Sequence, residues 1–365
     1  MSLNSAQTSP AGTPSSSTRF AGPIWTLIFL APFIAEVLSG ATRISFIFVL
    51  LPEMMVWGGG ALLCRELVRR WQAGATSLLM LGLALSIAEE FIIQQTSIAP
   101  LPWPGANANY GRIWGINWIY FLFMLGFESI FVVLVPVQVT ELLFPSRRKQ
   151  PWLRTRGIIV TCIAFLVGCR IAWYGWTQQA LKRMNIAPYH PPSLTIALGF
   201  ATIALLILLA YLLRETGHSG VVSSRRPAHP WIIGIAAFVF CAPWWVLMSL
   251  VFVPRPGLPV WIPMASGIGW ALMAFTTIRF LSAAQGWNDT HRWTLSFGAT
   301  LLSMSSAYIS TAGWLQIDLM GKAILNVLAV IGFLLLARNV WRRTDPEQLP
   351  KLQSPGCECG LNSDL

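Results

Sequence analysis

The chain has 365 residues, of which 55% are hydrophobic and only 11% are charged, and its mean hydropathy is +0.60. Soluble domains carry roughly 25% charged residues, so a water-soluble fold that hides this much apolar surface is excluded. The net charge of +11 does not indicate nucleic-acid binding, because basic residues in so apolar a chain set membrane topology and contact anionic lipids. The predicted fold class is all-α, a polytopic bundle of transmembrane helices in the cytoplasmic membrane.

Apolar stretches follow one another along most of the chain. Residues 1–22, rich in Ser, Thr and Pro, predict a disordered cytoplasmic tail, and residues 341–365 predict a second cytoplasmic tail. Between the tails lie ten stretches close to the roughly 20 residues that a spanning helix needs. Their predicted bounds are 23–42, 45–64, 75–95, 113–136, 156–176, 193–213, 231–253, 260–281, 293–313 and 318–340. The first two are separated by only a few residues and each contains Glu, so a re-entrant pair is the alternative for them.

The positions of Lys and Arg predict the orientation of these helices. With both termini in the cytoplasm, 18 of the 25 basic residues fall in cytoplasmic segments and Arg170 falls inside a helix. The remaining six are Arg43, Arg112, Lys182, Arg183, Arg255 and Lys322. Since Lys and Arg concentrate on the cytoplasmic side of membrane proteins, this split favours ten helices with the N-terminus and the C-terminus inside.

Carboxylates inside the predicted helices are confined to the N-terminal half of the chain. Each costs about 2.5–3.5 kcal/mol at the bilayer centre on insertion scales, so such residues mark functional sites. The distribution of these carboxylates divides the membrane domain into a polar-site half, residues 23–176, and an apolar half, residues 193–340. The one acidic residue in the predicted helices of the apolar half, Asp318, is at a helix end. The candidate substrate- or proton-binding residues are Glu36, Glu53, Glu89, Glu90, Gln94, Arg112, Asn117, Glu128 and Arg170.

The predicted depth of these residues indicates that several of them meet. Glu36, Glu53, the Glu89–Glu90 pair and Arg170 all fall in the outer halves of their helices. Arg170 is the only cation predicted inside a helix, so we expect it to pair with one or two glutamates while at least one Glu stays neutral at pH 7. The prediction is a polar cavity open to the outer side, under the loop of residues 97–110. The alternative is that these pairs only hold helices together.

Local features refine this prediction. Neighbouring residues on a helix point about 100° apart, so only one of Glu89 and Glu90 is expected to pair with Arg170 or Asn117 while the other faces the cavity. The run of glycines at 58–60 predicts close approach of a neighbouring helix. The prolines predict kinks that free backbone carbonyls; they are Pro32, Pro52 and Pro136.

Several stretches resemble a group of uncharacterised bacterial polytopic membrane proteins. They are residues 64–71, 89–95, 110–112, 117–118, 128–136, 141–145 and 151–153. The resemblance extends over roughly residues 30–155 and implies kinship, with no activity attached to it.

The Glu89–Glu90 pair is also loosely similar to the paired glutamates of glutamyl intramembrane proteases, which process prenylated and bacteriocin-type substrates. The signature of those proteases continues with Arg, where this chain has Gln94, and then with histidines inside the membrane. The four histidines here fall in loops or at a helix end; they are His190, His218, His229 and His291. Since no two of them share a helix face, no metal site and no cofactor are predicted.

The function that the sequence favours is a transporter or permease for a small solute, in which protonation of a Glu is coupled to movement across the membrane. An intramembrane enzyme, either a degenerate glutamyl protease or a lipid-modifying enzyme, is one alternative. A non-catalytic membrane scaffold is the other. The expected partners are membrane lipids and an unidentified small solute or lipid, with no nucleic acid.

Overall fold

The computed structural model describes residues 21–99, 110–183, 185, 189–214, 226–252, 257–309 and 313–344. Most of the predicted N-terminal tail, most of the predicted loop at 97–110 and most of the predicted C-terminal tail lie outside these residues. The described chain is helical except for one two-stranded hairpin and short connections. This confirms the all-α bundle predicted from composition.

The N-terminal helices alternate regular and distorted turns. The first is α1 (Ala21–Pro32) with the π-helical turn η1 (Phe33–Val37). The second joins η2 (Ile44–Val49), α2 (Leu50–Glu53), η3 (Met54–Gly58) and α3 (Gly59–Arg70). The third joins α4 (Ala75–Ala88) and η4 (Glu89–Ile93). The hairpin of β1 (Arg112–Ile113) and β2 (Ile116–Asn117) leads into α5 (Trp118–Phe127), η5 (Glu128–Leu134) and α6 (Val135–Leu143).

The later helices are longer and more regular. After the 3-10 turn η6 (Pro145–Arg147), the chain forms α7 (Thr155–Tyr174), η7 (Gly175–Ala180) and α8 (Leu181–Arg183), which together make one helix. It continues with α9 (Ser193–Leu212), α10 (Pro230–Phe252), α11 (Trp261–Ser282), α12 (Asp289–Ser306), the 3-10 turn η9 (Ala307–Ile309) and α13 (Gln316–Thr344).

Eight helices in the described part of the chain are long and apolar enough to cross a membrane. The shorter apolar helix Ala21–Val37 and α12 occupy the places of the first and ninth predicted spans. Every predicted span therefore has a helix at its position, and the orientation with both termini inside stays a prediction.

Two predicted helix starts differ from the structure by five and four residues, each for a local reason. The fourth span was expected from residue 113, but its helix begins at Trp118 because residues 112–117 form the hairpin. Gly111 and Gly115 have φ of +77° and +80°, a conformation that favours glycine. The ninth helix begins at Asp289, because the Asn288 side chain accepts hydrogen bonds from the backbone N–H groups of Thr290 and His291 and caps it.

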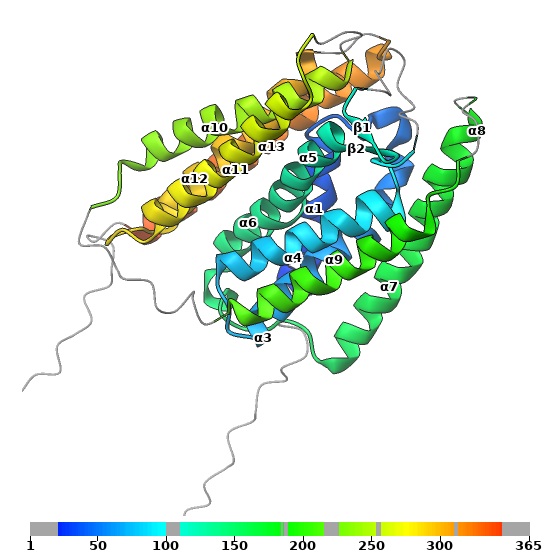
Figure 1. Cartoon of the computed structure of the whole chain (residues 1–365). Helices are drawn as coiled ribbons and strands as arrows, with labels where there is room; N and C mark the ends of the chain where they lie inside the picture. The colour runs from blue at the N-terminus through cyan, green and yellow to red at the C-terminus, as the bar shows by residue number, and fades with distance from the viewer. Residues whose placement is uncertain are drawn as a thin grey trace, which may run out of the picture.

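The bundle consists of two groups of helices, shown in Figure 1. Helices α10 to α13 lie together on one side, and α1 to α9 lie on the other, with α5 and α6 in contact with both groups. Burial shows which helices lie at the centre of the bundle. In the apolar 18-residue stretch of each helix, 67% of the residues are buried in Ala75–Ile93 and 61% in Trp118–Leu143, against 6% to 22% in the five later spans. The helices that carry Glu89, Glu90 and Glu128 are thus the core of the bundle.

Glycines set the closest helix crossings. A Cβ on Gly58 would lie 2.2 Å from the Ile28 carbonyl oxygen of α1, and one on Gly298 would lie 2.1 Å from the Gly234 oxygen of α10. No side chain fits at either crossing. The close approach predicted for the glycine run is therefore confirmed at Gly58.

Candidate functional site

Five glutamates from the core helices form what we call the acidic cluster: Glu36, Glu53, Glu89, Glu90 and Glu128. The Glu89 carboxylate interacts electrostatically with those of Glu90 and Glu36, and Glu128 interacts with all three. Glu36 interacts with Glu53 in turn. All but Glu36 are buried, and Glu89 has no exposed surface. Carboxylates from four separate helices thus converge on one region of the protein interior.

Each member of the acidic cluster lies at a π-helical turn. Glu36 lies within η1, Glu53 directly precedes η3, and the Glu89–Glu90 pair opens η4, while Glu128 opens η5. Prolines adjoin three of these turns: Pro32 precedes η1, Pro52 precedes η3 and Pro136 follows η5. Proline removes a helical hydrogen bond, and single π-turns occur frequently at functional sites.

The carboxylates differ sharply in their hydrogen bonds. Glu90 accepts hydrogen bonds from the Thr96 hydroxyl, at 2.9 Å to each oxygen, and from the Ser97 hydroxyl. Glu53 accepts one from the Thr42 hydroxyl. In contrast, neither oxygen of Glu89 and only one of Glu128 has a partner among the described residues. The asymmetry expected for Glu89 and Glu90 is present, although the partners of Glu90 are hydroxyls rather than Arg170 or Asn117.

Arg170 does not join the acidic cluster, so the predicted Arg–Glu pair is wrong. Its side chain is exposed on α7, with the guanidinium 4.6 Å from the centre of the Trp173 ring on the same helix. Among the described residues, no Lys or Arg forms an ion pair with any carboxylate of the cluster. The cluster is therefore a concentration of mostly buried acids that no basic side chain in the described segments neutralises through an ion pair.

The other candidates take supporting positions. The Asn117 side-chain oxygen caps α5 by accepting from the Tyr120 N–H at 3.0 Å, while its buried side-chain nitrogen has no partner among the described residues. Arg112 donates to the carbonyls of Ile98, Ala99 and Gly115, so it braces the hairpin rather than the carboxylates. Gln94 is partly buried and ends η4.

Two pockets of the described structure lie near Ile44, and none of the acidic cluster lines them. The outward cavity over the glutamates stays a prediction. In this conformation the cluster is enclosed by side chains, among them the buried Tyr120, which interacts with Glu90 and Glu128.

A second buried network, which the sequence did not predict, lies at the Arg-rich end of α3. Arg65 is fully buried, with its guanidinium 3.3 Å from the centre of the Trp152 ring. It donates to Glu141 and to the backbone carbonyls of residues 147, 148 and 150. Glu66 accepts from the Trp152 and Leu153 N–H groups. We call Arg65, Glu66, Arg69, Glu141 and Trp152 the basic-end network. All five residues lie in stretches that resemble the uncharacterised bacterial membrane proteins, namely 64–71, 141–145 and 151–153. That resemblance is the signal in the sequence that could have pointed to the network.

Residues 193–340 were expected to form an apolar half of the membrane domain. The structure corrects this expectation, because α13 in this half carries a buried polar face. Asp318, Lys322 and Asn326 recur every four residues and are all buried. Asp318 accepts from the Ser45 N–H and hydroxyl at 2.9 and 3.1 Å. The Lys322 ammonium donates to the Leu38 carbonyl at 2.7 Å. The last helix thus bonds directly to the segment between the first two.

Comparisons with known proteins place the chain in a family. A model of an uncharacterised membrane protein family matches residues 26–345. No curated protein and no solved structure gives a significant match. In the described part of the chain, no group of three or more His, Cys, Asp or Glu residues is arranged to hold a metal ion. Because the family model matches most of its length, the chain belongs to this uncharacterised family of membrane proteins.

Proposed function

We propose that this integral membrane protein is a proton-coupled transporter for a small solute, in which the acidic cluster binds the protons. The observation that carries the proposal is the convergence of five carboxyl groups with which no Lys or Arg of the described chain forms an ion pair. Isolated buried carboxylates are too costly to remain charged together, and protons are the simplest way to neutralise them.

Glu89 is the group best suited to exchange a proton. Both of its oxygens are buried and have no hydrogen-bond partner among the described residues, so nothing in this conformation holds its charge. A change that admits water or a cationic group to Glu89 would favour the charged form and release a proton. Release would then depend on conformation, which is the coupling that a secondary transporter needs.

The π-turns supply a physical means for that change. A π-turn leaves one helical residue out of the regular hydrogen-bond pattern, so the carboxylate beside it can rotate when the turn becomes regular. Such turns occur at the acidic residues of all four helices in the cluster. Glu36 is the one partly exposed member, so we assign it to the entry of the proton route.

The test is proton movement in proteoliposomes that contain a pH-sensitive dye. Gradients of small inorganic and organic cations are imposed one at a time, because an acidic site selects cationic solutes. At least one gradient should drive proton movement through the wild-type protein, and Glu89→Gln should abolish it. Arg170→Gln is the control, since Arg170 is exposed and forms no ion pair with a described carboxylate.

Infrared spectroscopy tests proton binding without knowledge of the solute. The wild-type protein should show a band of protonated carboxyl groups at neutral pH, and Glu89→Gln should reduce it. If the band is the same in both proteins and no gradient moves protons, the acidic cluster has a structural role and the transporter proposal is wrong.

A further inference from the structure

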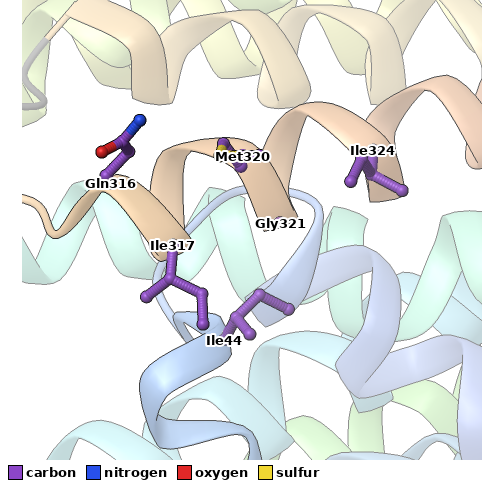
Figure 2. A pocket seen from close by; sticks show the side chains of 6 residues that line it. All are labelled: Ile44, Gln316, Ile317, Met320, Gly321 and Ile324. Carbon is purple, nitrogen blue, oxygen red and sulfur yellow. The ribbon is translucent and has the colours of Figure 1, made fainter.

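An open groove of about 510 Å³ runs along the start of α13, where that helix meets η2. Its walls are Ile44, Gln316, Ile317, Met320, Gly321 and Ile324. Figure 2 shows Ile317 of α13 opposite Ile44, with Ile324 further along the same helix. Ile317, Met320 and Ile324 are 58%, 56% and 56% exposed. The volume is within the range of about 300–1,000 Å³ that is typical of ligand sites.

A cationic niche adjoins the polar end of this groove. It shares Ile44 with the groove and is lined by Arg43, Trp314, Asp318 and Lys322, among others. The Arg43 guanidinium lies 4.6 Å from the centre of the Trp314 ring and forms no ion pair with a described carboxylate. Asp318 accepts both of its hydrogen bonds from Ser45, and the Lys322 ammonium is bound to a backbone carbonyl. The niche therefore presents an available positive charge.

The surface changes from polar at the cationic niche to apolar at the groove, in the direction in which α13 runs. Trp314 and Gln316 are at the start of α13, and Arg43, which precedes η2, lies over the Trp314 ring. Ile324 lies eight residues beyond Gln316, about 12 Å along the axis. Trp and Arg favour the headgroup level of a bilayer, while exposed isoleucines favour the acyl chains. The surface beside the groove is also apolar, since Phe46, Ile47 and Phe48 of η2 are exposed.

We propose that this groove binds one anionic phospholipid, with its phosphate on Arg43 beside Trp314 and one acyl chain along Ile317, Met320 and Ile324. A guanidinium matches phosphate oxygens with two parallel hydrogen bonds, and the apolar wall matches a hydrocarbon chain. The bound lipid joins η2 to α13 from the membrane side. This inference does not depend on the proposed transport function.

Native mass spectrometry of the full chain in detergent measures the site. Phosphatidylglycerol and phosphatidylcholine with the same acyl chains are added separately. The wild-type protein should bind the first phosphatidylglycerol more tightly. Arg43→Gln should weaken that binding about tenfold, as expected for a lost charge-assisted hydrogen bond, and Arg43→Lys should recover part of it. Arg170→Gln is the matched control, because its guanidinium lies at the same 4.6 Å from a Trp ring, away from the groove.

Equal affinity of the wild-type protein for the two lipids, or equal losses in Arg43→Gln and Arg170→Gln, would overturn the proposal. Displacement of phosphatidylglycerol by inorganic phosphate alone would also overturn it, since the site would then bind an ion rather than a lipid.

A second pair of variants tests the apolar wall and does not depend on the folding of the Arg43 variants. Ile317→Trp partly fills the groove, whereas Leu335→Trp adds the same side chain eleven residues beyond the last groove residue, Ile324, at a position that is also 58% exposed. We expect weaker phosphatidylglycerol binding only in Ile317→Trp. The same affinity in both variants would show that the groove is not where the acyl chain binds.

Discussion

Glu89 and Glu90 are adjacent in the chain but have opposite surroundings. Glu90 accepts hydrogen bonds from two hydroxyls, whereas Glu89 accepts none from the described residues. We predict that Glu90→Gln destabilises the protein by roughly 1–3 kcal/mol, because an amide nitrogen cannot accept these bonds. Glu89→Gln should leave stability nearly unchanged, since Gln is neutral and similar in size. Thermal unfolding in detergent measures both; equal large losses would mean that both carboxylates are structural.

Arg65 supplies a stability prediction at the opposite end of the bundle. Its removal leaves Glu141 with one cation fewer and three backbone carbonyls without this donor. Breaking a buried ion pair costs about 3–5 kcal/mol, so Arg65→Met should lower the free energy of unfolding by that amount. Arg170→Met, at an exposed arginine that also stacks on a Trp ring, should cost less than about 1 kcal/mol. Denaturant unfolding measures the free energy of unfolding of the two variants. Similar losses in both would contradict the structural role assigned to Arg65.

Individual residues also show where prediction from the sequence ends. Glu36, Glu53 and the Glu89–Glu90 pair could be placed together from their predicted depth, because a carboxylate in a spanning helix must face the protein interior. Glu128 was not part of that depth prediction, and the structure adds it to the cluster. Arg170 could not be placed, because α7 is apolar on all sides and its sequence carries no periodic signal for the buried face. From the sequence, Arg65 counts only among the basic residues that predict topology, because nothing near it in the chain shows that the carbonyls of residues 147, 148 and 150 accept its hydrogen bonds.

Among the elements, the crossing of α10 and α12 gives the clearest test. A Cβ on Gly298 would collide with the Gly234 carbonyl, whereas a Cβ on Gly332 of α13 would have nothing within 4 Å. Gly298→Ala should therefore destabilise the protein by about 1–3 kcal/mol. Gly332→Ala should stabilise it by about 0.5–1 kcal/mol through helix propensity. Melting temperatures that shift in the same direction for the two variants would contradict the close contact between Gly298 and the Gly234 carbonyl.

The helices themselves were predictable, and their internal distortions were not. Long apolar runs predict spans because a bilayer requires a fixed length of helix. Each of the ten predicted positions contains a helix, and eight helices of the described chain are long and apolar enough to cross a membrane. The prolines predicted kinks, but where a kink becomes a π-turn depends on the neighbouring helix. The hairpin before Trp118 was missed because Ile113, Trp114 and Ile116 are as apolar as a helix in the membrane.

At the scale of the whole molecule, the basic end of the bundle also holds the C-terminal end of α13. Leu153 is at the basic-end network, and Arg343 near the end of α13 donates to the Leu142 carbonyl. A reporter active only in the cytoplasm should work when fused after Leu153 and after Thr344, and fail after Gly115 and after His190. A reporter active only outside should give the inverse pattern. Activity of the cytoplasmic reporter after Gly115 would reject the predicted orientation.

The hydrogen bonds from Ser45 to Asp318 join residues 273 positions apart in the chain. Ribosomes add about 5–20 residues per second, so roughly 15–55 s pass between the synthesis of the two partners. During that interval the Ser45 N–H and the Leu38 carbonyl lack their hydrogen-bond partners on α13, Asp318 and Lys322. The insertion machinery or water must satisfy these groups in the meantime, and biogenesis of the first two helices ends only when the last one arrives.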